Sequence, residues 1–393
     1  MRILTLNAGS SSLKASVIDT GQEETLLQFH ADWSAHPTVC HVTVPGRDES
    51  RSEENWSDVT SAVRVACSEV IANLSSDIDA VAHRVVHGGT HFTKTALMTP
   101  EAESVIQELA TLAPLHNPRC LEGIAAARCS LPQIPHVATF DTAFHASLPP
   151  EAFTYPVPHA WTVEWGIRKY GFHGLSHSYS ARRVAEIVGS PLSELRIVVA
   201  HLGHGASLCA IKSGRSVDTT MGFTPLEGVM MGTRSGSIDP GVILHVMREH
   251  HVSVSRMDRL LNHESGLLGV SRVSADMRHV QQAAQSGNDR AKLAIEMYVH
   301  RVRQAIAAMA TSMAGLDALV FTGGIGEHAG EVRQAVCAPL EFLGIKLSEQ
   351  LNDTSQPDSQ ISDVASQIPV FIIAAREDLM LAREASALLE KLP

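Results

Sequence analysis

Apolar residues follow two different patterns along this chain. Short apolar runs predict strands at residues 2–7, 13–19, 80–86, 136–140, 196–202, 207–211, 318–322 and 369–373. Longer stretches in which apolar residues recur every three or four positions predict helices near residues 57–73, 100–111, 118–128 and 290–312. In the last of these, Ala294, Met297, Tyr298, Val302, Ile306 and Met309 mark one face. Strands that alternate with helices indicate an α/β protein.

One local pattern occurs twice. Residues 2–19 form an apolar run, a turn of small residues and a second run, and residues 196–211 repeat that order. The likeness suggests a duplicated unit, one in each half of the chain. Residues 147–160 contain four prolines and show no periodicity, which predicts the crossing from one domain to the other.

Composition narrows the class of protein. The chain has 393 residues, of which 44% are hydrophobic and 19% charged, and this is typical of a soluble protein with two domains. A net charge of −11 argues against nucleic-acid binding. No apolar run reaches the roughly 20 residues that a membrane span needs, and the N-terminus lacks a signal-peptide pattern. Six widely spaced cysteines without a C-x-x-C motif predict reduced thiols and a cytoplasmic location.

Three glycine- or serine-rich turns follow predicted strands, at residues 8–12, 203–206 and 323–326. Such turns bring backbone N–H groups close to phosphate oxygens, although any one of them alone is more simply a tight turn. Three of one kind favour a bound nucleotide. The P-loop motif is absent from the sequence. The G-x-G-x-x-A pattern at residues 324–329 lacks the acidic residue of a nicotinamide-binding unit, which disfavours that class.

Two arginines stand where a cation is costly. Arg84 lies in an apolar run and Arg234 in a glycine-flanked loop, so each needs an anion. That anion is either a substrate carboxylate or phosphoryl group, or a neighbouring carboxylate in a structural ion pair.

Other polar residues stand at strand ends. Asp141 follows residues 136–140 and is either a ligand-binding acid or the N-cap of the next helix. His173 is a candidate donor to a phosphoryl oxygen, with a zinc role through His-x-x-x-His less favoured. Glu377 is a candidate Mg²⁺ ligand, while Asn7 and Lys14 form a polar group on the first hairpin, where Lys14 suits a phosphate or is simply solvated.

In this order, the motifs resemble the acetate kinase family over essentially the whole chain. The matching segments are residues 7–14, 82–89, 113–118, 140–145, 170–174, 218–225, 231–236, 274–278 and 321–327. The resemblance implies two duplicated domains of the actin, hexokinase and Hsp70 type (ribonuclease H-like), with the active site in an interdomain cleft. It implies an N-terminal domain of residues 1–146 plus 379–393 and a nucleotide-binding domain of residues 147–378. It also implies a homodimer that transfers the ATP γ-phosphoryl group to acetate directly and reversibly, giving acetyl phosphate and ADP.

The resemblance further implies a role for each matched residue. It implies that Asp141, His173 and Arg234 are catalytic. It also implies that Asn7 and Glu377 bind Mg²⁺, with Mn²⁺ as an alternative ion. Substrate contacts fall to Arg84, Arg234 and the acetate-methyl pocket of Val86, Leu115, Phe172 and Pro225. Nucleotide contacts fall to Lys14, His201, Leu202, Gly203, His204, Gly205, Asp276, Met277, Arg278, Gly324, Ile325, Gly326, Glu327 and His328.

Three segments depart from the family pattern. His204 stands where asparagine or serine is usual, and His328 where asparagine is usual. Arg376 and Asp378 flank Glu377 in place of asparagine and glutamate. The first two departures put nucleotide affinity and donor choice in question.

Two alternatives remain open from the sequence. Propionate or butyrate kinase differs from acetate kinase by a few pocket atoms, and one methylene is worth only about 1–3 kcal/mol of discrimination. A non-catalytic nucleotide-binding regulator of the actin or Hsp70 type would not need Arg84, Asp141, His173 and Arg234 together.

Overall fold

The structure is a computed structural model that describes residues 1–9, 11–34, 36–74, 77–114 and 116–392. The chain divides into two compact units. Unit 1 consists of Met1–Ala146 and Arg376–Pro393, and unit 2 of Ser147–Ala375. Leu115, one of the residues predicted for the acetate pocket, lies outside the described residues.

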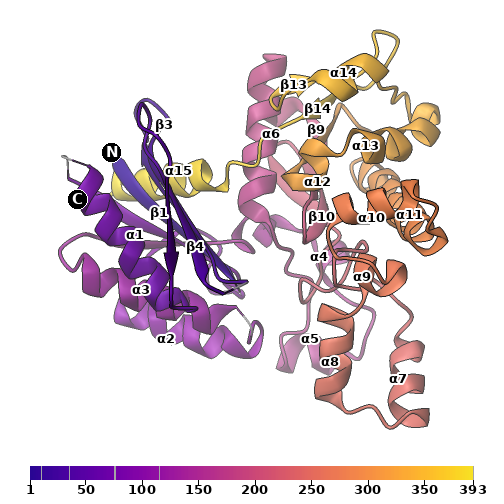
Figure 1. The fold of residues 1–393 in the computed structure, drawn as a ribbon. Coiled ribbons are helices and arrows are strands. Elements are labelled where there is room, and N and C mark those ends of the chain that lie inside the picture. The colour runs from indigo at the N-terminus through magenta and orange to yellow at the C-terminus, as the bar shows by residue number, and fades with distance from the viewer. Residues whose placement is uncertain (10, 35, 75–76, 115, 393) are drawn as a thin grey trace. The chain divides into compact units, whose positions relative to one another are not determined.

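The described part of unit 1 is built on an eight-stranded sheet in the order β5-β4-β3-β2-β1-β6-β8-β7 (Figure 1). Its strands are β1 (Arg2–Ala8), β2 (Ser12–Asp19), β3 (Glu24–Asp32), β4 (Thr38–Thr43), β5 (Ser50–Glu54), β6 (Ala80–Val85), β7 (Ala96–Leu97) and β8 (His136–Phe140). Strands β1 to β5 form an antiparallel meander, whereas β6 pairs in parallel with both β1 and β8. The first predicted hairpin is therefore confirmed.

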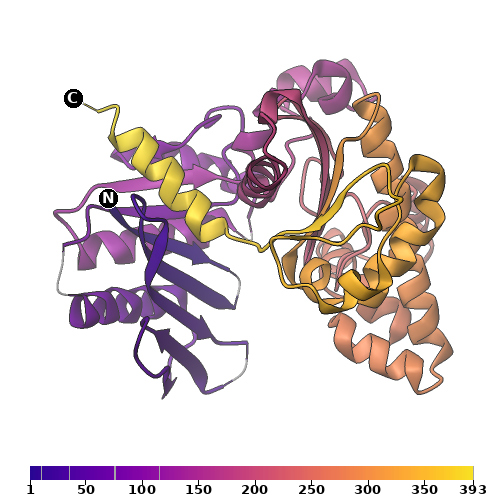
Figure 2. The ribbon, with the colours of Figure 1, turned by 90° about the horizontal axis from the view of Figure 1, so that it is seen from above.

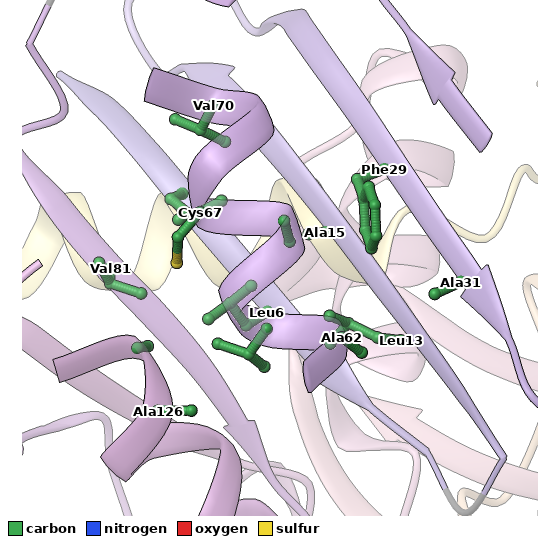
Figure 3. Close-up of a cluster of buried hydrophobic side chains, with 14 of the residues drawn as sticks. Leu6, Leu13, Ala15, Phe29, Ala31, Ala62, Cys67, Val70, Val81 and Ala126 are labelled. Carbon is green, nitrogen blue, oxygen red and sulfur yellow. The ribbon is translucent and has the colours of Figure 1, made fainter. Parts of the chain in front are cut away.

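Helices cover both faces of this sheet. They are α1 (Val59–Asn73), α2 (Pro100–Glu108), α3 (Asn117–Ser130) and α15 (Glu377–Leu389), with the 3₁₀ helices η1 (Leu109–Thr111) and η2 (Ala143–Ser147). Helix α1 lies over one face, and α15 runs behind the strands on the other (Figures 2 and 3). The last helix of the chain thus completes the first unit.

The core of unit 1 follows from the apolar spacing of α1. Its buried residues Val59, Ala62, Val63, Ala66, Cys67 and Val70 recur three or four positions apart and so share one face. Asp58 caps this helix, because its carboxylate accepts from the backbone N–H of Ser61 at 2.8 Å. The helix packs on alternate residues of β1 to β3, among them Leu6, Leu13 and Phe29 (Figure 3). This burial is the main force that holds α1 against the sheet.

The described part of unit 2 has a six-stranded sheet in the order β11-β10-β9-β12-β14-β13. Its strands are β9 (Arg196–Leu202), β10 (Ala206–Lys212), β11 (Arg215–Thr219), β12 (Ala318–Thr322), β13 (Ser359–Gln360) and β14 (Val370–Ile372). Its helices are α4 (Pro150–Phe153), α5 (His159–Glu164), α6 (Gly174–Val188), η3 (Leu192–Glu194), α7 (Pro240–Glu249), α8 (Val254–His263), α9 (Gly266–Ser271), α10 (Met277–Gln285), α11 (Asp289–Ser312), α12 (Gly323–His328), α13 (Gly330–Cys337), η4 (Ala338–Leu343) and α14 (Glu349–Thr354). Helix α6 covers one face of the sheet and α11 the other (Figure 1).

The two sheets share a topology. In unit 1 the order β3-β2-β1-β6-β8 has two antiparallel pairings followed by two parallel ones. In unit 2 the order β11-β10-β9-β12-β14 has the same succession. The predicted duplication of an α/β unit is therefore confirmed.

Some elements differ from the sequence prediction. Of the six residues predicted to mark one face of α11, Ala294, Tyr298, Val302, Ile306 and Met309 are buried, whereas Met297 is 37% exposed. Met297 therefore lies at the edge of the apolar stripe. Residues 147–160, whose sequence shows no periodicity, contain α4 and the start of α5.

Two further predictions concern thiols and membranes. All six cysteines are free thiols, as the sequence predicted, and five of them are buried, whereas Cys129 is exposed. Among the described residues, no helix combines the length and the apolar character needed to cross a bilayer.

Candidate active site

In unit 1, three of the predicted site residues lie where parallel strands end. Asn7 is near the end of β1, Arg84 is near the end of β6, and Asp141 follows β8 directly. The pairings of Leu6 with His83 and of Val85 with Phe140 align these strands. Because the carboxyl ends of parallel strands meet at one edge of a sheet, their polar side chains converge there.

Arg84 is the centre of this group. Its Nε donates to Asp141 Oδ1 at 2.9 Å, its Nη2 to Asp141 Oδ2 at 2.5 Å, and its Nη1 to Asn7 Oδ1 at 2.9 Å. Asp141 is only 1% exposed. Burial opposes the charge of the guanidinium, but Asp141 and then Glu377 outweigh it and raise the pKa of Arg84. The ion pair that the sequence left open for Arg84 is therefore present.

Glu377 extends the group. It is the first residue of α15, its Oε2 accepts from Asn7 Nδ2 at 3.0 Å, and it lies 3.9 Å from Arg84 Nε. Two carboxylates and an amide oxygen thus gather within unit 1. Mg²⁺ prefers oxygen ligands and is usually held by one or two carboxylates together with water and phosphate oxygens. The side chains present fit that ion.

Two other predicted residues lie close to this group in the fold. Lys14 is exposed on β2 and pairs with Asn7 across the hairpin. Val86 directly follows β6 and is 7% exposed. The group therefore combines one exposed lysine with one buried apolar side chain.

In unit 2, two glycine-rich segments follow neighbouring parallel strands. Residues 203–205 follow β9 and residues 323–326 follow β12, and these strands pair in parallel with Thr322 opposite His201. Gly323 has φ 78°, and a Cβ there would lie 2.9 Å from the carbonyl oxygen of Leu202. Only glycine suits that position. The second segment can therefore lie directly against the end of β9.

These segments border a cavity of about 680 Å³. Predicted nucleotide contacts that line it are Gly203, His204, Asp276, Met277, Arg278, Gly324, Ile325 and His328. The other lining residues are Ser274, Ala275, His279, Gln281 and Ala329. A space of this size with apolar walls and a few polar groups suits a small organic ligand.

The remaining predicted nucleotide contacts in unit 2 are His201, Leu202, Gly205, Gly326 and Glu327, and they do not line this cavity, whereas Lys14 belongs to unit 1. Glu327 forms two hydrogen bonds with the backbone: its Oε1 accepts from the N–H groups of Gly323 and Ala375, each at 3.0 Å. The carboxylate thus joins the segment after β12 to the chain that follows β14.

Asp276 and Arg278 interact at the cavity wall. Asp276 caps α10 by accepting from the backbone N–H of Arg278 at 2.9 Å. Its carboxylate also accepts from the guanidinium of Arg278, and this bond lowers the pKa of Asp276 to about 2. Asp276 is therefore an anion at neutral pH, and the Arg278 guanidinium beside it stays exposed to solvent.

His173 and Arg234 meet at Gly205. A Cβ built on Gly205 would lie 3.4 Å from His173 Nε2 and 3.5 Å from Arg234 Nη1. The absent side chain of Gly205 thus leaves a space that two side-chain nitrogen atoms border. Gly205 belongs to the same segment as Gly203 and His204 of the cavity wall.

Arg234 differs from Arg84 in its partners. Its Nη1 donates to the carbonyl oxygen of Pro225 at 3.1 Å and contacts Met231 Sδ at 3.7 Å. Within the part of the chain that the structure describes, no carboxylate pairs with it. Burial lowers the pKa of Arg234, as expected for a guanidinium without a counter-charge. A partly buried cation of this kind is complementary to an anionic ligand.

His204 and two of the residues predicted for the acetate pocket lie in unit 2. Burial, and then the charge of Arg234, lower the pKa of His204, so its ring is neutral at pH 7. Phe172 is 1% exposed and Pro225 is half-buried. The predicted interdomain cleft stays a prediction, since the structure places the residues of each unit only within that unit.

The sequence analysis missed several side chains that support these groups. Ser207 joins His173 to His177, and Tyr155 donates to Glu227, which lies two residues after Pro225. A serine inside a buried strand was the available signal for Ser207. His279 and Gln281 also line the cavity, and their place on α10 beside Met277 could have indicated this.

Comparison with known proteins places the chain in a family. The model of the acetokinase family matches residues 2–383. The acetate kinase of Microcystis aeruginosa is 46% identical over 98% of both chains. The crystal structure of Porphyromonas gingivalis acetate kinase has a TM-score of 0.91 at 38% identity, covering 99% of both chains. A propionate kinase from Francisella tularensis also has a TM-score of 0.91 at 38% identity, covering 98% of both chains. The chain belongs to the acetokinase family.

Proposed function

We propose that this protein is an acetate kinase that transfers the γ-phosphoryl group of ATP to acetate, reversibly, giving acetyl phosphate and ADP. The family match and the relatives named acetate kinase, at 46% identity over nearly the full chain, support this function. The chain is thus a phosphotransferase whose acceptor is a carboxyl group, and the non-catalytic regulator is not supported.

One observation in the structure carries the proposal. Arg234 and His173 border the space beside Gly205, and among the described residues the guanidinium of Arg234 contacts the carbonyl oxygen of Pro225 and the thioether of Met231 but no carboxylate. Phosphoryl transfer spreads negative charge over three oxygens, and fixed donors aimed at them supply most of the catalysis. We assign both residues to the migrating phosphoryl group.

Acetate needs cations and alignment more than it needs a base. It is already ionised at pH 7, so no strong base has to deprotonate it. We assign Arg84 to the carboxylate of the substrate. Asp141 already accepts two hydrogen bonds from Arg84, and we propose that it acts by fixing this guanidinium and by organising the metal site.

The nucleotide and the metal are assigned on the same basis. We place ATP in the cavity bordered by Gly203, Asp276 and Gly324. Glu377 and Asn7 would hold Mg²⁺, or Mn²⁺, directly or through water, and Lys14 would contact phosphate oxygens. When bound, the cation neutralises charge on the phosphates as the phosphoryl group moves.

The apolar residues give the acyl preference. We propose that Val86, Phe172, Pro225 and Leu115 enclose the methyl group of acetate. Relatives of 43–47% identity bear the name acetate kinase, which favours acetate over propionate or butyrate.

An acyl hydroxamate assay with ATP, Mg²⁺ and each of the three acids tests the function. Acetate should give the highest kcat/KM, followed by propionate and then butyrate. Absence of hydroxamate with all three acids would overturn the kinase assignment, and a preference for propionate would overturn the acetate assignment.

We also propose that the protein is a homodimer in the cytoplasm. The structure describes every residue of α7, and none of them is buried. The apolar side chains on this helix are therefore open to solvent, with Val242 50% and Leu244 64% exposed. A helix with such an apolar face is usually covered by a partner. Light scattering should give a particle mass of twice the chain mass of 42.3 kDa. The substitution Leu244→Asp should lower the measured particle mass. A monomeric wild-type protein would contradict the dimer. Six free thiols support the location.

A further inference from the structure

A single hydroxyl group lies between two histidine rings behind the space at Gly205. Ser207 Oγ is 2.9 Å from His173 Nδ1 and 2.7 Å from His177 Nε2. Ser207 lies on β10 and His177 on α6, and neither is exposed to solvent. Water therefore does not compete for these bonds.

The hydroxyl has only one proton to share between the two nitrogens. If it donates to His173 Nδ1, its oxygen must accept from His177 Nε2–H, and if it donates to His177, it must accept from His173 Nδ1–H. The tautomers of the two rings are therefore coupled through Ser207. In the first arrangement, neutral His173 has its proton on Nε2, and in the second, Nε2 of the neutral ring is left without one.

The two nitrogens of His173 face different surroundings. Nδ1 faces Ser207, whereas Nε2 borders the space beside Gly205 and Arg234. The ring also packs on His201, with centroids 4.4 Å apart, and His201 Nδ1 is 2.8 Å from Ser176 Oγ. These contacts fix the direction in which Nε2 points.

The backbone of His173 supports the same arrangement. His173 directly precedes α6 and has φ 57°, a left-handed conformation that is strained for a non-glycine residue. Its carbonyl oxygen accepts from the backbone N–H of His177 at 3.0 Å, so both histidines belong to the first turn. Ser207 thus contacts two rings whose relative position the helix sets.

We propose that Ser207 and His177 are positioning residues, which keep neutral His173 protonated at Nε2 so that this nitrogen donates to the phosphoryl group. The inference rests on the proposed kinase function and on the place assigned there to His173. The bond order is His177 Nε2–H to Ser207 Oγ, then Ser207 Oγ–H to His173 Nδ1. No proton is gained or lost in this arrangement.

Ser207→Ala tests the proposal, because it removes the hydroxyl and leaves the volume nearly unchanged. Two-bond ¹H–¹⁵N spectra of histidine-labelled protein, recorded above the ordinary histidine pKa of about 6.5, report which ring nitrogen has the proton. The His173 signal is identified by its loss in His173→Gln. Wild-type protein should show His173 protonated at Nε2, and Ser207→Ala should show a mixture of tautomers.

Kinetics give a second readout. In Ser207→Ala, kcat for acetyl phosphate formation should fall by the factor by which the Nε2–H fraction of His173 falls, and by up to about 100-fold where the freed ring also loses its orientation. The KM values for ATP and acetate should change less than about threefold, since an interaction made mainly in the transition state lowers kcat.

Two variants separate this role from a packing role. His177→Gln keeps an N–H donor for Ser207 and should retain kcat within about threefold, whereas His177→Leu removes it and should behave like Ser207→Ala. Ser180→Ala is the matched control. Ser180 is also buried on α6, and among the described residues its hydroxyl has no hydrogen-bond partner, so its kcat should be unchanged.

A failure of the kinase assignment would appear in the wild-type protein, as absence of acetyl phosphate formation. The results for Ser207→Ala test the positioning role separately. A shift of the His173 tautomer together with lower kcat in Ser207→Ala supports the proposal. An unchanged Nε2–H tautomer in Ser207→Ala overturns it whatever the kcat. A wild-type ring protonated at Nδ1 alone also overturns it.

Discussion

Replacing Gly205 by alanine tests whether the space beside it is where the phosphoryl group is transferred. The added Cβ would lie 3.4 Å from His173 Nε2 and Cε1 and 3.5 Å from Arg234 Nη1. These are ordinary van der Waals distances, so the backbone has no need to move. The methyl group would instead occupy the place from which an oxygen accepts hydrogen bonds, at about 2.7–3.1 Å from each donor.

The expected effects on activity and stability have opposite signs. A displacement of the phosphoryl group by about 1 Å is enough to lower the rate roughly 100-fold. The free energy of unfolding should rise by about 0.4–1 kcal/mol, because alanine restricts the unfolded chain and fits the folded one. A variant that is more stable and much less active would separate the loss of the site from loss of the fold.

The assay compares kcat/KM for acetyl phosphate formation with the urea unfolding midpoint. Gly123→Ala in α3 is the matched control, since its Cβ would meet the side chain of Val59 at 3.6 Å, also an ordinary contact. It should gain stability and keep its activity. Wild-type kcat/KM in Gly205→Ala would refute the assignment of this space to the phosphoryl group.

Three other predictions concern the supports of the site, the fold and the metal. Tyr155→Phe removes the hydroxyl that donates to Glu227, and the free energy of unfolding should fall by about 1–3 kcal/mol, read from urea titration; an unchanged midpoint would contradict this. Burial lowers the pKa of His83 and His136 below their usual 6.5, so the unfolded chain takes up protons there that the folded chain does not. The free energy of unfolding should therefore fall as the pH drops below about 6.5, and a flat or rising profile would argue against it. Glu377→Gln should raise the Mg²⁺ concentration for half-maximal activity about tenfold or more, and an unchanged requirement would remove Glu377 from the metal site.

Much of the fold could be predicted because its signals are local. The first hairpin alternates or clusters apolar residues around a turn of small residues, and the structure pairs Arg2–Ala8 with Leu13–Asp19. The polar strand β5, with the sequence Ser-Arg-Ser-Glu-Glu, has no such signal. It forms because its backbone pairs with β4 at the edge of the sheet, which no property of its own side chains reveals.

In the candidate site, too, single residues could be predicted from local signals, whereas the contacts between distant residues could not. Arg84 was identified as a cation within an apolar run and Asp141 from its place at a strand end, but the bonds between them join residues 57 positions apart and depend on the register of β6 and β8. The sequence left the partner of Arg84 open for that reason. Ser207 was missed because a small polar residue in a buried strand says nothing of the rings that a distant helix brings to it.

The account rests most heavily on Arg234, the guanidinium whose side chain has no carboxylate partner among the described residues. The most direct test is kcat for acetyl phosphate formation by Arg234→Ala, with the exposed Arg51→Ala as the matched control. Loss of one donor to a developing charge lowers kcat about 100- to 1000-fold, and loss of a full cation should reach at least the upper value. The account predicts that fall, with Arg51→Ala unchanged. Near-normal turnover by Arg234→Ala would contradict it.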